Sequence, residues 1–249
     1  VFIADWIEGD KTEIAQPKTL KKHISYLSSD ELQGRLTGSV GEKKAAAYIV
    51  KEFKSLGLKP YANKSYLQTF NYKVKINPHS TDASSDKANS GTNVIAFLDN
   101  KASKTIVIGA HYDHLGLNEH NHSSKPNSHG EIHNGADDNA SGVAAVLELA
   151  RMFSQNKTKE NVNYLFALFS GEEDGLIGSK HMAETLKNLY PNVVTMINLD
   201  MIGRLDKDKS LTVGGIGTAP EFSTIITKNK PAGFNVTLDN AGQGPSDHT

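Results

Sequence analysis

The sequence predicts an α/β fold, a three-layer α/β/α sandwich in which helices cover both faces of a mixed, mainly parallel sheet. Apolar segments with the length of buried strands alternate along the chain with segments of helical period. Three of the apolar segments are followed by a histidine or by acidic residues. Because parallel strands have their carboxyl ends at one edge of a sheet, this second pattern predicts a ligand site there. The 249 residues can bury a full core, and one large α/β domain fits this length as well as two small ones. From the pattern of elements, we expect a single domain over residues 1–249 without an inserted domain.

The predicted helices have apolar residues at helical spacing, and some have a clear start or end. Pro17 opens the first helix, and Leu20, Ile24 and Leu27 follow on one face. Gly57 ends the second helix, because glycine is the usual residue after a helical segment. The helices are expected over residues 17–32, 42–56, 141–153, 176–189 and 220–228.

The predicted strands are short apolar runs or short alternating segments. They are expected over residues 68–76, 93–98, 105–110, 162–169, 193–199, 211–214 and 234–238. Two polar stretches lie between these elements. Residues 77–90 are rich in Ser, Asp and Asn, and we interpret them as a surface connection. We interpret residues 118–134 as a long loop that holds four histidines.

The composition excludes several classes of function. The net charge is -1 and most basic residues are lysines, so we expect no nucleic-acid surface and no polybasic membrane patch. No apolar run approaches the roughly 18 residues of a membrane-spanning helix. The absence of cysteine excludes disulfides, thiolate zinc sites and a cysteine nucleophile. The chain begins at Val1 rather than Met, so we expect that an upstream segment was removed.

The residues that can carry chemistry stand at the ends of predicted strands, before a helix and near the end of the chain. They are His111, Asp113, Asp137, Asp138, Glu172, Glu173, Asp200 and His248. Histidine, aspartate and glutamate in this mix are ligands of Zn²⁺. The residues alone therefore predict a metal site. The alternative is that these acids cap helices and lie in solvated loops.

Five motifs in order give the chain a resemblance to the M28 family of co-catalytic zinc peptidases. They are HYDH at 111–114, GADDNASG at 135–142, GEEDGLIGS at 171–179, NLDMIGR at 198–204 and SDH at 246–248. Residues 28–60 also resemble the segment that precedes these motifs in the family. The resemblance covers most of the chain. It implies the zinc-peptidase form of the α/β/α fold, two zinc ions per chain and a peptide substrate.

The resemblance also implies which residues bind the metals. The implied zinc ligands are His111, Asp138, Glu173, Asp200 and His248. Asp138 is implied to bridge the two ions. It is preferred to Asp137 because the bridging aspartate of the family lies four residues before the glycine that is Gly142 in this chain.

Two further residues are implied to act in catalysis. Asp113 is implied to hold the second ring nitrogen of His111, as ligating histidines require. Glu172 is implied to be the general base, while its neighbour Glu173 binds metal. The resemblance also implies a cis peptide bond between Asp138 and Asn139.

Other polar residues carry weaker signals. The polar loop holds the remaining candidates for metal binding, which are His120, His122, His129 and His133. A solvated loop is the preferred interpretation for these histidines, and adventitious metal binding is the alternative. His114 either lines the active-site cleft or packs against its neighbours. Asp206, Lys207 and Asp208 are interpreted as a surface turn.

The expected function is that of a zinc-dependent aminopeptidase in an extracytoplasmic location, either periplasmic or secreted. One alternative is a single-zinc glutaminyl cyclase of the same fold. Another is a binding module that keeps the fold without catalysis. Members of the family continue beyond their last histidine ligand, so we expect C-terminal elements of the domain to be missing after Thr249. The sequence leaves the oligomeric state and the choice between aminopeptidase and carboxypeptidase open.

Overall fold

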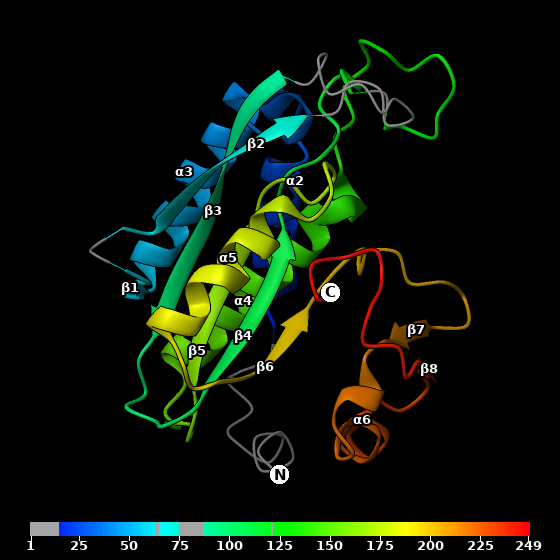
Figure 1. Cartoon of the computed structure of the whole chain (residues 1–249). Helices are drawn as coiled ribbons and strands as arrows, with labels where there is room; N and C mark the ends of the chain where they lie inside the picture. The colour runs from blue at the N-terminus through cyan, green and yellow to red at the C-terminus, as the bar shows by residue number, and fades with distance from the viewer. Residues whose placement is uncertain (1–14, 63–64, 75–86, 121) are drawn as a thin grey trace.

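The computed structural model describes residues 15–62, 65–74, 87–120 and 122–249, and it has the predicted α/β fold (Figure 1). Its main sheet has six strands in the order β1-β3-β5-β4-β6, and β2 also pairs with β3. The strands are β1 (Lys59–Pro60), β2 (Leu67–Val74), β3 (Lys87–Leu98), β4 (Thr105–His111), β5 (Asn163–Phe169) and β6 (Val193–Asn198). The sheet is mixed. Strand β4 pairs in parallel with β5 and β6, whereas β3 is antiparallel to β1, β2 and β5.

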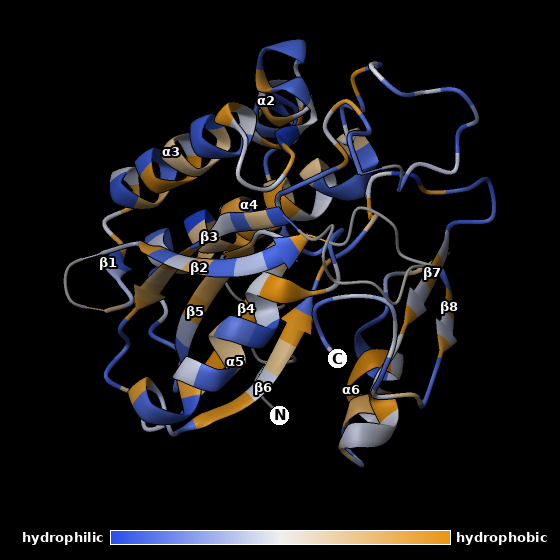
Figure 2. Ribbon diagram, turned by 45° about the horizontal axis from the view of Figure 1, so that its top comes forward, coloured by the Kyte–Doolittle hydropathy of each residue, from blue (hydrophilic) through white to orange (hydrophobic). Residues whose placement is uncertain are grey.

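Helices cover both faces of this sheet. Helices α2 (Pro17–Leu27), α3 (Val40–Ser55) and α4 (Gly142–Gln155) pack on one face, and their apolar residues join those of β3, β4 and β5 in the larger core. Helix α5 (Ile177–Leu189) covers the other face, where Met182 packs against alternate residues of the same strands. Figure 2 shows apolar colour concentrated in the strands between these layers. The three-layer prediction is therefore confirmed.

Burial explains why the central strands lack an alternating pattern. Every residue of β5 is buried, and so is nearly every residue of β4. A strand with helices on both faces has no solvated side, so it reads as a continuous apolar run. Strands β4 and β5, which lead to His111 and to the paired glutamates, are thus the most firmly packed part of the sheet, whereas β6, which leads to Asp200, is partly exposed.

Two predicted boundaries differ from the structure near the N-terminus. The helix predicted over residues 17–32 ends at Leu27, and a 3-10 helix (Asp30–Arg35) follows it. Within that turn Gln33 and Arg35 have positive φ values of 46° and 51°, which no α-helix accommodates. The next helix begins at Val40, two residues earlier than predicted, because the Ser39 side chain accepts a hydrogen bond from the Glu42 backbone N–H.

A third difference concerns the strand predicted over residues 93–98. Strand β3 begins at Lys87, because β2 pairs with it along its whole length, as far as Val74 opposite Lys87. Most residues between 87 and 92 are exposed or half-buried, so they carry no apolar signal. The rest of the connection predicted over residues 77–90 lies outside the described residues.

The segment after β6 forms a small unit of its own beside the main sheet (Figure 1). It contains β7 (Ser210–Val213), a 3-10 helix (Ile216–Thr218), α6 (Phe222–Asn229) and β8 (Asn235–Leu238). Strands β7 and β8 pair in parallel as a separate two-stranded sheet. No residue from 201 to 245 is buried, so this unit adds no core of its own.

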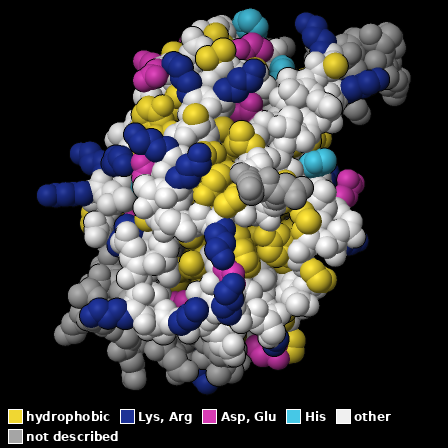
Figure 3. Space-filling model, turned by 90° about the vertical axis from the view of Figure 1, so that its left-hand side faces the viewer, with side chains coloured by type: hydrophobic (Ala, Val, Ile, Leu, Met, Phe, Trp, Pro, Cys, Tyr) yellow, Lys and Arg dark blue, Asp and Glu magenta, His cyan; other side chains and the backbone are white. Residues whose placement is uncertain are grey.

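The surface agrees with the near-neutral composition. On the face that carries α3, β1 and β2, Lys and Arg side chains are spread among uncharged and hydrophobic side chains (Figure 3). Among the described residues, no helix combines the length and apolar character needed to span a bilayer.

Candidate metal centre

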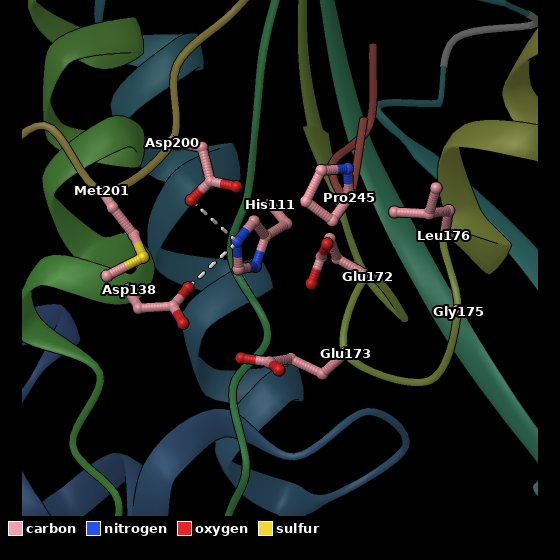
Figure 4. Close-up of a pocket in the computed structure, with 9 residues that line it drawn as sticks. All are labelled: His111, Asp138, Glu172, Glu173, Gly175, Leu176, Asp200, Met201 and Pro245. Carbon is pink, nitrogen blue, oxygen red and sulfur yellow. Dashed lines mark ion pairs between the residues drawn. The ribbon is translucent and has the colours of Figure 1, made fainter. Parts of the chain in front are cut away.

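The carboxyl ends of β4 and β6 bring an imidazole and two carboxylates together. His111 is the last residue of β4 and is almost fully buried. Its Nε2 lies 3.1 Å from Asp138 Oδ1 and 3.4 Å from Asp200 Oδ1. Figure 4 shows the His111 ring between these two carboxylates, with Glu172 and Glu173 on a neighbouring loop of the same pocket. Asp200 reaches this point because it follows β6, the parallel neighbour of β4.

A second group of donors meets the other oxygen of Asp138. His114 Nδ1 lies 2.6 Å from Glu173 Oε1 and 3.8 Å from Asp138 Oδ2. The Asp138 carboxylate therefore has one oxygen beside each group of donors. This is the position that a bridging carboxylate needs between two metal ions. His114 itself is nearly buried and does not line the pocket, which it reaches through its contact with Glu173.

Asp138 is presented by a tight loop that leads into α4. Gly135 starts this loop at a φ of 57°, and a Cβ there would lie 2.2 Å from the Asp138 carbonyl oxygen. The Asp138–Asn139 peptide bond is cis, as the family resemblance implied. The Asn139 side chain donates to Leu199 O and accepts from Met201 N, at 2.9 and 3.3 Å. Asn139 thus ties the loop of Asp138 to the loop of Asp200.

Asp137 takes no part in the two groups of donors. Its Oδ1 accepts a hydrogen bond from Gly203 N at 2.8 Å. This geometry favours Asp138 over Asp137 as the bridging residue. The metal roles themselves stay predictions.

Asp113 holds two parts of the site at once. His111 Nδ1 lies 3.2 Å from the Asp113 carbonyl oxygen and 3.7 Å from its carboxylate. A hydrogen bond donated there leaves Nε2 free to bind a metal. The buried Asp113 carboxylate also accepts from Glu172 N and Glu173 N at 3.3 and 3.4 Å. Asp113 therefore positions the paired glutamates as well as the histidine, a contact that the sequence did not indicate.

Arg35 is a positioning residue that the sequence analysis missed. Its guanidinium is fully buried and donates to the carbonyl oxygens of Tyr112 at 2.7 Å, Asn134 at 2.7 Å and Gly135 at 3.0 Å. It also donates to Leu27 O. Burial lowers the pKa of Arg35 to about 10, while nearby Asp113 and other acids raise it, so the side chain stays charged at neutral pH. The only signal in the sequence was an arginine in a chain whose basic residues are mostly lysine.

Glu172 lines the same pocket and forms a further metal-capable group with His111 and Glu173. Burial raises the pKa of Glu172 to about 8, His111 opposes this rise, and Asp113, Glu173 and Asp247 add to it. A carboxyl group with a pKa near neutrality can both take up and release a proton at neutral pH. These properties fit the role of general base that the family resemblance implied.

The last motif is placed differently from the other four. The exposed His248 belongs to none of the metal-capable clusters among the described residues, and its ring packs against Gly244. It is still close enough to Asp200 to lower the pKa of that carboxyl. Its neighbour Ser246 donates to Asp200 Oδ2 at 2.7 Å. The predicted role of His248 as a ligand therefore stays a prediction.

Asp247 was given no role from the sequence, although it lies in the same motif. Its side chain is buried near His111 and Asp200, and neither carboxylate oxygen has a hydrogen bond of good geometry among the described residues. Burial raises the pKa of Asp247, and the charge of His111 and the nearby Ser179 hydroxyl partly offset this rise, so that the resulting pKa is about 7.

The structure corrects the interpretation of the loop histidines as solvated for His120 and His133, whereas His122 and His129 are exposed. His133 lies beside His114 with its Nε2 buried and without a hydrogen bond among the described residues. His120 and His122 pack against Asp174. Of the two exposed loop histidines, His129 belongs to none of the clusters among the described residues.

The donors of the main site fit zinc. Ligand atoms on a tetrahedral zinc, with bonds of about 2.0–2.1 Å, lie about 3.3 Å apart. The distances from His111 Nε2 to the Asp138 and Asp200 oxygens, 3.1 and 3.4 Å, bracket this value. Asp200 Oδ1 is also buried without a hydrogen bond among the described residues. A cation would satisfy this oxygen.

Comparison with known proteins agrees with this chemistry. Residues 93–249 match the model of Peptidase family M28. Over 106 residues the chain is 41% identical to a probable zinc metalloprotease of Pyrenophora tritici-repentis, a match that covers 43% of this chain and 22% of that protein. Over 217 residues it is 31% identical to the alkaline phosphatase isozyme conversion protein of Escherichia coli, covering 85% of this chain and 57% of that protein. The matched part thus spans less than two thirds of either relative.

Solved structures share the fold at low sequence identity. A glutaminyl cyclase from Porphyromonas gingivalis superposes with a TM-score of 0.71 and 19% identity, covering 94% of this chain and 78% of that one. A leucine aminopeptidase precursor from Bacteroides thetaiotaomicron gives a TM-score of 0.70 and 17% identity, covering 94% and 80%. At these identities the likeness concerns the fold alone.

Proposed function

This chain belongs to peptidase family M28, and from that premise we propose that it is a zinc-dependent aminopeptidase that removes N-terminal residues from peptides. One observation carries the proposal. The Asp138 carboxylate lies between two groups of donors, and Glu172 lines the same pocket. A shared carboxylate with a free acid beside it is the arrangement that two-metal hydrolysis requires.

His111, Asp138 and Asp200 would hold one zinc ion. Asp138 and Glu173 would hold the second, with either His114 or His248 as the histidine ligand. When bound, zinc supplies a Lewis acid that polarises the scissile carbonyl and lowers the pKa of the attacking water. The remaining steps of the reaction use side chains of this chain and the attacking water.

Glu172 carries the proton through the reaction. It accepts a proton from the attacking water as the water oxygen bonds to the peptide carbonyl carbon. It then delivers that proton to the amide nitrogen as the C–N bond breaks, so the amine product leaves neutral. Asp113 keeps Glu172 in place through the backbone N–H of that residue, and Thr37 Oγ1 in turn donates to Asp113 at 3.1 Å.

The charge of the pocket favours an aminopeptidase over a carboxypeptidase. The described residues that line its ≈ 420 Å³ include four acids and no Lys or Arg. Zinc would neutralise three of these acids, but the lining still offers no basic side chain to bind the terminal carboxylate of a carboxypeptidase substrate. Leu176, Met201 and Pro245 add apolar surface at the same pocket (Figure 4). This surface supports binding of an apolar N-terminal residue.

The test is an assay of the zinc-loaded protein on aminoacyl p-nitroanilides with free and acetylated N-termini. We expect turnover of the free substrates alone, strongest with apolar residues. Turnover of acetylated substrates would contradict aminopeptidase activity. Glutaminyl peptides assayed for ammonia release test the single-zinc cyclase of the same fold. Activity in neither assay would favour the binding module.

A further inference from the structure

A separate cluster of metal-capable side chains lies outside the candidate metal centre, in His120, His122 and Asp174. We propose that these three residues bind a divalent transition metal ion. The ion would join the loop that follows β4 to the loop that carries Glu172 and Glu173. The proposal stands on its own geometry and does not depend on the proposed function.

The three donors already have the spacing of ligands around one ion. The Nδ1 atoms of His120 and His122 lie 2.9 and 3.8 Å from Asp174 Oδ1. One ligand atom from each residue lies within 4.8 Å of the other two. Ligand atoms on a tetrahedral zinc are about 3.3 Å apart, so small side-chain adjustments would complete the site. Two imidazoles and a carboxylate suit zinc and its neighbours among the transition metals.

Asp174 is fixed before any ion binds. Its side chain is only 4% exposed, and Tyr72 donates its hydroxyl hydrogen to Oδ2. Asn89 Nδ2 donates to the Tyr72 hydroxyl oxygen at 2.9 Å, which directs the phenol hydrogen toward Asp174. The other oxygen, Oδ1, is left for the two imidazoles. Partners of this kind orient metal-binding carboxylates and raise their affinity for the ion.

The loop that presents the histidines is closed by its own hydrogen bonds. The buried Asn118 side chain accepts from Ser123 N at 3.0 Å and donates to Ser128 Oγ at 3.2 Å. Gly130 N donates to Leu117 O at 2.8 Å across the base of the loop. The side chains of His120 and His122 remain 17% and 26% exposed. An ion therefore has access from solvent, and water can complete its coordination.

The competing explanation is an ion pair without a metal. His120 lies beside Asp174, whose hydrogen bond raises the pKa of the imidazole. Glu119 and Lys87 are the other charged groups that act on His120, and their effects oppose each other. A protonated His120 would satisfy Asp174 but would leave His122 with only a distant carboxylate. A metal ion engages all three side chains.

The experiment measures zinc per chain in the whole protein after equilibrium dialysis at defined free Zn²⁺. Wild type is compared with the His120→Ala/His122→Ala double variant, and the exposed His129→Ala in the same loop is the matched control. We expect the double variant to lose one equivalent of zinc and the control to lose none. Repeating the pair in an Asp138→Ala background separates this zinc from that of the main site. In the Asp138→Ala background, we expect the His120→Ala/His122→Ala change to remove the last strongly bound equivalent of zinc.

A milder variant keeps the test valid if the double variant fails to fold. Tyr72→Phe leaves all three ligands in place and removes only the hydroxyl that orients Asp174. We expect it to weaken zinc binding at this site about 10–100-fold. Equal zinc binding in wild type, Tyr72→Phe and the double variant would overturn the proposal and leave an ion-paired cluster only. That result would not affect the peptidase assay, which reports on the Asp138 site.

Discussion

Two regions of the chain meet at the candidate metal centre, and they are held in different ways. The region around β4 and β5 supplies His111, Glu172 and Glu173 from a core in which β5 is buried throughout. The segment from 199 to 249 supplies Asp200 and carries His248, yet none of its residues from 201 to 245 is buried. One region is supported by packing, and the other by a small number of polar contacts.

The buried region supports the site with hydrogen bonds as well as apolar packing. Thr37, Glu42 and Ser170 are buried together beneath the Glu172 loop, and Ser170 Oγ donates to Glu42 at 2.6 Å. Thr37 Oγ1 accepts from Gly171 N at 3.0 Å. In the other region, a few side chains contact the Asp200 loop, namely Asp137, Asn139, Ser141 and Ser246. Buried hydrogen bonds thus position Glu172 before any metal binds, whereas we expect Asp200 and His248 to reach their final order only with metal bound.

The largest expected effect is at the residue where the two regions join. Asp138→Ala should lower the affinity for both metals of the main site and abolish activity, because this carboxylate faces both groups of donors. Asp137→Ala should leave at least one ion strongly bound, because its carboxylate contacts Gly203 N instead. Zinc per chain, measured on both variants, is the readout. Equal losses would remove the basis for choosing Asp138.

A large effect on turnover is expected within the buried region. Glu172→Gln should lower kcat by roughly 10²–10⁴-fold, the usual contribution of a positioned general base. Zinc content should stay unchanged, because Glu172 is not among the implied ligands. Kinetics and metal analysis on the same preparation check both statements. A variant that loses its zinc, or that keeps full activity, would show that the role is misassigned.

Two arginine variants, one in each region, test whether the buried region contributes more to the free energy of unfolding than the C-terminal segment. Arg35→Ala should lower the free energy of unfolding by about 3–5 kcal/mol, because it leaves two buried and two partly buried carbonyl oxygens without their donor. Arg204 is exposed in the other region, so Arg204→Ala should change that free energy by no more than about 0.5 kcal/mol. Urea unfolding of the two variants gives the comparison directly. Similar losses would mean that the C-terminal segment is better supported than its exposure indicates.

The sequence predicted the parts of the fold and site that depend on local pattern. Buried strands read as apolar runs, and the acids and histidine that follow them converge because parallel strands end at one edge. The contacts of Arg35 were not predictable, because its four partners come from positions 27, 112, 134 and 135. The pairing of His120 with Asp174 spans 54 positions and has no local signature either. The end of the first helix was misjudged because positive φ values leave no mark in an apolar pattern.

The smallest expected effect on stability concerns a buried carboxylate outside the candidate metal centre. Glu148 on α4 is 2% exposed and accepts from Arg151 at 2.8 and 3.0 Å and from Gln16 N at 2.6 Å. Burial by itself would raise the pKa of Glu148, but the hydrogen bonds from Arg151 and Gln16 outweigh it and hold the pKa below its ordinary value. At pH 7, Glu148→Gln should lower the free energy of unfolding by about 1.5–3 kcal/mol, the range for hydrogen bonds to charged groups.

This loss should depend on pH in one direction only. Because the pKa of Glu148 is lower in the folded than in the unfolded chain, the unfolded chain binds more protons as the pH falls below the ordinary value. The stabilisation is therefore complete at neutral pH and disappears as the pH falls through the folded pKa, where wild type and variant converge. Asp206→Asn removes an exposed carboxylate from the C-terminal segment, and the hydrogen bond from Ser210 N lowers the pKa of this carboxyl as well. Because solvent screens this bond, its pH-dependent difference should be much smaller. Urea unfolding of both pairs from pH 7 downward is the measurement. A Glu148→Gln difference that stayed constant with pH would assign the effect to packing and would remove this contrast between the two regions.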